Sequence, residues 1–65
     1  MQENYDHLAR KPYLTVSEAA RFMGVGKKII YQLIDFGEIH AIRERGAVKI
    51  DTQSLQAFRA SGKLT

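Results

Sequence analysis

The stretch from Gly24 to Gly37 constrains this fold more than any other, because it carries the full pattern of one amphipathic helix. At 100° per residue, its apolar side chains fall on one side and its polar side chains on the other. The apolar side holds Ile29, Ile30, Leu33, Ile34 and Phe36. Gly26 suits the N-cap, and Gly37 supplies the left-handed residue that ends a helix. The sequence therefore predicts a helix over residues 27–36.

The polar side of this helix carries more than ordinary surface residues. Lys27 and Lys28 lie in the first turn, beside the positive end of the helix dipole, where an exposed cation costs about 0.3–1 kcal/mol. Tyr31 offers a hydroxyl, and Gln32 offers both a donor and an acceptor. Lysines suit phosphates and a bidentate amide suits a base edge, so this face is fit to enter a DNA major groove. A solvated surface without function is the alternative.

Length and composition limit the classes of protein to which this chain can belong. Its 65 residues suffice for one domain that buries about 60% of its unfolded surface. Because it has no cysteine, disulfides, thiolate metal sites and cysteine nucleophiles are excluded. No apolar run is long enough to cross a membrane, and the N-terminus lacks a signal peptide pattern, so we expect a cytoplasmic protein. The net charge of +3 favours an anionic partner.

The N-terminal segment shows little periodicity, and we expect a flexible arm over residues 1–12. Within it, Asn4 suits the cap of a single helical turn that packs Tyr5 and Leu8 against the domain. Pro12 forces the residue before it toward an extended conformation, and it marks where the domain begins.

A capping box formed by Thr15 and Glu18 predicts the start of another helix. The side chains on its inner face are Val16, Ala19, Ala20, Phe22 and Met23. A turn at residues 24–26 joins it to the helix over residues 27–36. Two short helices joined by such a turn make a helix-turn-helix, in which the second helix reads DNA. Arg21, at the end of the first helix, is then a candidate phosphate contact.

Two short runs rich in β-branched residues, at 39–43 and 47–50, follow the helices. They flank a hairpin turn at residues 44–46, where Gly46 supplies a positive φ. We therefore expect a two-stranded wing beside the reading helix.

Three cations lie on the expected wing. Arg43 and Arg45 lie near its tip, and Lys49 lies on the second strand. Such a group suits a phosphate backbone or a narrow minor groove. A solvated hairpin tip is the alternative, because Glu44 between the arginines neutralises one charge.

A cap at Asp51 or Thr52 predicts a last helix, in which Leu55 and Phe58 anchor the small core. The predicted fold is mainly α with a small β-hairpin. It is a winged helix-turn-helix domain over residues 13–62, with a two-helix helix-turn-helix, a two-stranded wing and a C-terminal helix.

No set of residues in the sequence suggests catalysis. His7 and His40 are lone histidines without a second ligand at metal spacing. The glycines of the turn lack the Gly-Lys-Ser/Thr ending of a phosphate-binding loop. No two carboxylates are placed to share a site, and a chain this short leaves little room for a pocket. We therefore expect no enzyme activity, no metal and no cofactor.

Five segments of the sequence carry a family resemblance. They are YLTVSEAA (13–20), MGV (23–25), IYQLI (30–34), GEI (37–39) and VKI (48–50). These segments resemble the excisionase-type helix-turn-helix family, a compact relative of the MerR winged-helix DNA-binding domain. The resemblance covers residues 13–60. It implies that the second helix reads the major groove, that the wing contacts a minor groove or backbone, and that the protein comes from a bacterium, phage or mobile element.

The resemblance also assigns side chains to the DNA interface by position. They are Lys27, Lys28, Tyr31 and Gln32 on the reading helix and Arg43 and Arg45 on the wing. The sequence departs from the family pattern at three positions. Gly26 replaces the usual serine cap, Ile29 replaces a small polar residue, and Asp35 stands where a basic residue is frequent. No long dimerisation helix follows Phe58, so we expect no small-molecule effector.

Three functions remain open at this point. The first is a sequence-specific double-stranded DNA-binding protein that bends DNA and directs a recombinase toward excision. Its partners would be an integrase and further copies of itself on adjacent sites. The second is a small MerR-like transcriptional regulator. The third is a protein interaction module that holds a partner through Ile29, Tyr31 and Phe36.

Overall fold

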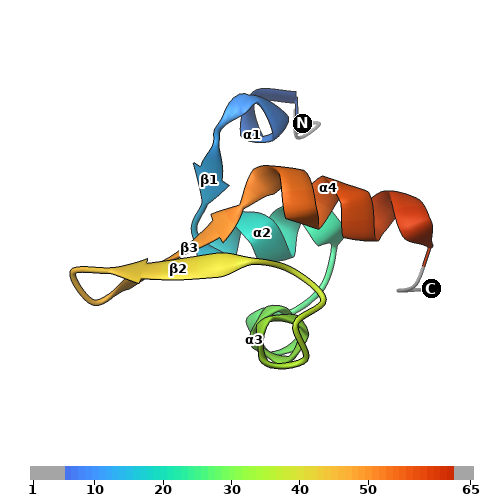
Figure 1. Ribbon diagram of the computed structural model, residues 1–65. Coiled ribbons are helices and arrows are strands. Elements are labelled where there is room, and N and C mark those ends of the chain that lie inside the picture. The colour runs from blue at the N-terminus through green and yellow to red at the C-terminus, as the bar shows by residue number, and fades with distance from the viewer. Residues whose placement is uncertain (1–5, 63–65) are drawn as a thin grey trace.

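A computed structural model of the protein describes residues 6–62 of the chain (Figure 1). The elements in this range are α1 (Asp6–Arg10), β1 (Tyr13–Leu14), α2 (Val16–Met23), α3 (Lys27–Asp35), β2 (Ala41–Glu44), β3 (Ala47–Asp51) and α4 (Thr52–Ser61). The predicted winged helix-turn-helix is confirmed. α2 and α3 form the helix-turn-helix, β2 and β3 form the wing, and α4 follows as the C-terminal helix.

α2 begins at the predicted capping box. The Glu18 amide donates to the Thr15 hydroxyl at 3.1 Å, and the Thr15 amide donates to the Glu18 carboxylate at 3.0 Å. The second carboxylate oxygen of Glu18 accepts a hydrogen bond from the Lys11 ammonium at 2.6 Å. The helix ends at Gly24, which is left-handed with φ 72°. α2 is therefore defined at both ends by local chemistry.

The contacts of Glu18 stabilise the charged form of its side chain. The hydrogen bond from Lys11, and after it the bond from the Thr15 amide, lower the pKa of the Glu18 carboxyl below its ordinary value of 4.5. A carboxyl whose pKa is lower in the folded state stabilises the fold above its unfolded pKa. That stabilisation is lost as the pH falls through the folded pKa.

Replacing Glu18 with glutamine is expected to lower the free energy of unfolding at neutral pH by under about 1 kcal/mol, because the Lys11 pair is partly exposed. The loss should shrink toward zero at a pH below the folded pKa of Glu18, which is itself below 4.5, because the wild-type carboxyl is then protonated too. Glutamine can still complete a capping box, so the helix start is retained. Urea unfolding of both proteins at the two pH values measures the difference. A loss that does not change with pH would contradict the assigned role of the charge.

The sheet has three antiparallel strands in the order β1-β3-β2, one more than the predicted two-stranded wing. On one side of β3, Leu14 of β1 lies opposite Ile50. On the other side, Ala41 of β2 lies opposite the same Ile50. Residues opposite one another in a sheet point to the same face, so these three side chains form a row that packs on the helices. The two-residue β1 is too short to show alternation, so the sequence did not predict it.

The hairpin turn is shorter than predicted. Glu44 pairs with Ala47 as the last rung of the ladder, so the loop is Arg45 and Gly46 rather than residues 44–46. Both residues have positive φ, at 54° and 80°, as a type I′ turn requires. Arg45 therefore lies at the tip of the wing, and its conformation is uncommon for a residue with a side chain.

One core joins all of the helices and the sheet. Its buried members are Leu8, Leu14, Val16, Ala19, Ala20, Phe22, Ile30, Leu33, Ile39, Ile50, Leu55 and Phe58. α4 also covers α2 through the Arg59 guanidinium, which lies 4.8 Å from the centre of the Phe22 ring.

The short helix α1 brings Leu8 into the core, where 6% of the residue is exposed. The predicted packing of Leu8 against the domain is therefore confirmed. Asn4 and Tyr5, which the sequence analysis assigned to the same turn, lie outside the described residues. The flexibility of the arm stays a prediction.

Phe36 falls on the apolar side of the predicted helix, but it does not pack in the core. Ile30 and Leu33 are buried and Ile29 and Ile34 are partly buried, whereas Phe36 is 75% exposed. At 100° per residue, Phe36 lies about 90° round the helix from the direction between the two buried residues. It is the cap residue of α3, so its side chain lies at the border of the buried face and reaches solvent.

Candidate nucleic-acid interface

The ends of α3 hold this helix in one position. Gly26 is its N-cap, as predicted, and has an extended backbone. At the other end, the amide of Gly37 donates to the Ile34 carbonyl at 3.0 Å, and the amide of Glu38 donates to the Leu33 carbonyl at 2.9 Å. With Gly37 left-handed at φ 74°, these bonds form a Schellman motif. The predicted helix boundary at Gly37 is thus confirmed.

The outer face of α3 presents the four predicted polar side chains together. Lys27, Lys28 and Gln32 are exposed, and Tyr31 is 46% exposed. Among the described residues, none of these four side chains has a hydrogen-bond or ion-pair partner. They are therefore available to a ligand without breaking contacts within the domain.

The predicted wing cations lie in three different environments. Arg43 lies opposite Val48, so its side chain leaves the sheet on the helix-facing side, near the tip. Arg45 lies in the turn. Lys49 lies on the outer face, where its ammonium binds the Glu44 carboxylate at 2.9 Å. The sequence suggested that Glu44 neutralises one of the two arginines beside it. In the structure, Glu44 instead pairs with Lys49.

α3 and the tip of the wing lie away from α1, whereas β1 pairs with β3 at the base of the wing. In Figure 1, α3 lies at the bottom, the wing projects to the left, and α1 lies at the top. Arg21 is exposed in the last turn of α2, next to the turn that leads into α3. The candidate site residues therefore gather on α3, on the wing and at the junction of the two helices of the helix-turn-helix.

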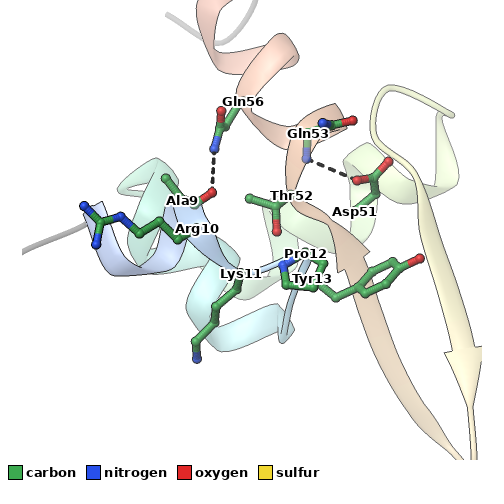
Figure 2. Close-up of a pocket in the computed structure, with 9 residues that line it drawn as sticks. All are labelled: Ala9, Arg10, Lys11, Pro12, Tyr13, Asp51, Thr52, Gln53 and Gln56. Carbon is green, nitrogen blue, oxygen red and sulfur yellow. Dashed lines mark hydrogen bonds between the residues drawn. The ribbon is translucent and has the colours of Figure 1, made fainter.

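A hollow of about 400 Å³ lies between the end of α1, β1 and the start of α4 (Figure 2). It is lined by Ala9, Arg10, Lys11, Pro12, Tyr13, Asp51, Thr52, Gln53 and Gln56. The polar groups around it already bind one another. The Thr52 amide donates to the Pro12 carbonyl at 3.1 Å, and the Gln53 amide donates to the Asp51 carboxylate at 3.1 Å. The first amides of α4 are therefore engaged and the Asp51 carboxylate disfavours an anion.

Two further polar groups line this hollow. The Gln56 amide donates to the Ala9 carbonyl at 3.2 Å, which ties α4 to α1. The Thr52 hydroxyl is buried, and it has no hydrogen-bond partner within residues 6–62. The Gln56 bond and the Thr52 amide bond join the N-terminal segment to the start of α4.

The sequence also led us to expect no metal site and no catalytic residues. Within the described residues, no group of three His, Cys, Asp or Glu side chains could hold a metal ion. His7 and His40 are both exposed. In the same part of the chain, no helix has the length and apolar character needed to span a membrane.

Comparison with known protein families identifies the architecture. A family model described as a helix-turn-helix domain matches residues 13–63, which is most of the chain. The chain belongs to this helix-turn-helix family. The family is the excisionase-type one that the sequence segments resemble. Searches among curated proteins and among solved structures found no significant match.

Family membership carries a functional meaning. The helix-turn-helix family implies binding to double-stranded DNA, and its members are typically not enzymes. The matched range begins at β1, so α1 lies before it.

Phe36, whose only function considered above was to hold a protein partner, is exposed beside the reading face. The helical wheel held the signal, because Phe36 lies farther round the helix from Ile30 and Leu33 than either Ile29 or Ile34 does. Its place at the last turn also leaves no following turn of helix to cover it.

Proposed function

We propose that this protein is a sequence-specific double-stranded DNA-binding protein that acts as an excisionase-like architectural factor in recombination. One observation carries the proposal. The second helix of a helix-turn-helix, α3, presents two lysines, a tyrosine and a glutamine that have no partner within the described domain. In this fold, that helix is the one placed to enter the major groove.

Different side chains of α3 make different contacts with DNA. Lys27 and Lys28 contact phosphates, where cations release condensed counterions and supply affinity without sequence preference. Gln32 reads a base edge, since a glutamine amide can bond both N6 and N7 of adenine. Tyr31, half-exposed beside them, adds a hydroxyl that can bond a phosphate or a base.

The wing supplies a second contact, to the backbone or to an adjacent minor groove. Arg43 and Arg45 near its tip are the principal cations of this contact, and Arg21 adds a phosphate contact at the end of α2. Lys49 contributes less, because its ammonium is held by Glu44 at 2.9 Å on the outer face. The wing thereby extends the footprint beyond the groove occupied by α3.

The role in recombination is the finer part of the proposal. A domain of this size makes few base contacts, so high affinity requires further copies on adjacent sites or a bound integrase. The cytoplasm of a bacterium, including one that carries a phage or mobile element, is the setting for such a factor. If the protein fills adjacent sites cooperatively and bends the DNA, that result would support this role. If it binds one isolated operator, that result would support a small MerR-like transcriptional regulator instead.

An amide chemical-shift titration with a mixed-sequence duplex tests DNA binding without knowledge of the target. At low salt, we expect shifts concentrated at residues 27–32 and 43–46, and we expect them to weaken as salt is raised. A variant with both Lys27→Glu and Lys28→Glu is the control, and its shifts should be largely lost. If no residue shifts, or only residues before Pro12 shift, DNA binding by α3 is wrong and the protein interaction module becomes the leading function.

A further inference from the structure

Phe36 stands out among the exposed apolar side chains of the described residues. It is 75% exposed, whereas Tyr13, Tyr31 and Ile42 are 44–46% exposed. Scattered apolar residues on a surface need no explanation by themselves. Phe36, however, directly follows α3, whose outer face carries the residues proposed to read DNA.

The backbone places Phe36 one turn beyond Gln32. The Phe36 amide donates to the Gln32 carbonyl at 2.9 Å, and the residue has helical φ and ψ of −83° and −3°. Residues four apart on a helix share a face. Helical side chains also lean toward the helix N-terminus. Phe36 therefore lies on the same face of the helix as Gln32.

The end of α3 that holds Phe36 carries no cation that could contact a phosphate. Both lysines of α3 lie in its first turn, and its last turn has no basic residue. The residue before Phe36 is Asp35, whose carboxylate repels phosphate. The Schellman bonds of Gly37 and Glu38 hold this end in place before any ligand binds.

The spacing along the helix matches the spacing of base pairs. Four residues of helix rise by about 6 Å, at about 1.5 Å per residue. Two base-pair steps span about 7 Å, at about 3.4 Å per step. If Gln32 lies at one base pair, Phe36 lies close to a base about two steps away. The only apolar group on a base edge in the major groove is the 5-methyl group of thymine.

We propose that Phe36 is a specificity-determining residue that packs against a thymine methyl group in the major groove. This inference rests on the proposed reading of DNA by α3. It adds apolar recognition to the polar recognition by Gln32. It also gives a function to the most exposed of the large apolar side chains within residues 6–62.

Removal of the thymine methyl groups tests the contact directly. A preferred duplex is first selected with the wild-type protein, and each thymine is then replaced in turn by deoxyuridine, which pairs identically but lacks the methyl group. We expect one or two replacements to weaken wild-type binding by about three- to fivefold each, the value of burying one methylene. The same replacements should have little effect on Phe36→Ala. Tyr13→Ala, which removes an exposed aromatic ring from β1, should keep the wild-type response.

The outcomes separate this inference from the proposed function. If the wild-type protein binds no duplex, DNA reading by α3 is wrong and the thymine contact falls with it. If it binds duplexes but deoxyuridine weakens wild type and Phe36→Ala equally, only the thymine contact is overturned. Phe36→Leu provides a second variant, and it should keep part of the deoxyuridine effect because leucine remains apolar. Circular dichroism of each variant confirms that the fold is retained.

Discussion

Replacement of Ile30 by alanine should lower the free energy of unfolding by about 2–5 kcal/mol, because it leaves a cavity where α3 meets the rest of the core. Ile30 is among the largest of the fully buried side chains within the described residues. Small domains have a total stability of only about 5–15 kcal/mol, so the loss is a large part of the whole. Urea unfolding followed by circular dichroism measures it.

Phe36→Ala is the matched control for this substitution. Both residues are large and apolar, and the sequence pattern placed both on the buried side of the same helix. Because Phe36 is 75% exposed, its replacement should change the free energy of unfolding by no more than about 0.5 kcal/mol. Equal losses for the two variants would mean that Phe36 packs in the core, and the thymine contact would then be untenable.

The parts of the fold that the sequence predicted well are those set by neighbouring residues. The start of α2 depends on Thr15 and Glu18, which are three residues apart, and both hydrogen bonds of the box form as expected. The ends of α3 depend on two glycines. Gly26 is the N-cap residue with an extended backbone, and Gly37 adopts the left-handed conformation that ends the helix. Such signals require no knowledge of the rest of the chain.

The parts that the sequence missed depend on residues far apart in the chain. β1 exists because Leu14 pairs with Ile50, and no local pattern marks a strand of two residues. The exposure of Phe36 depends on where the core ends, which periodicity alone does not define. The predicted turn began one residue too early, because Glu44 pairs with Ala47 in the ladder across the hairpin.

The candidate site shows the same division. The polar face of α3 follows from helical periodicity, so the sequence alone gathers Lys28, Tyr31 and Gln32. The environments of the wing cations depend on the register of β2 against β3. That register puts Glu44 and Lys49 on the same face, where they pair. The sequence could name the cations, but it could not tell which of them a carboxylate would neutralise.

Gln32→Ala is expected to weaken binding to the preferred duplex by about 1–3 kcal/mol and to relax the preference at one base pair. The loss follows because the amide that reads the base edge is removed, while every phosphate contact remains. Fluorescence anisotropy against a panel of single-base variants of the duplex measures both effects. Wild-type affinity and preference in Gln32→Ala would show that this residue does not read a base.

Lys28→Ala and Arg43→Ala should behave differently from Gln32→Ala, and the contrast distinguishes reading from positioning. Each removes one cation from the proposed backbone contacts, so affinity should fall by a similar factor on every sequence. The slope of log affinity against log salt should decrease in size by about one, since one fewer counterion is released.

Lys49→Ala is the matched control on the wing. Its ammonium is already paired with Glu44, so its salt slope should stay closer to that of wild type. If Lys49→Ala changes the slope as much as Arg43→Ala does, DNA binding breaks the Glu44 pair and the outer face of the wing belongs to the interface.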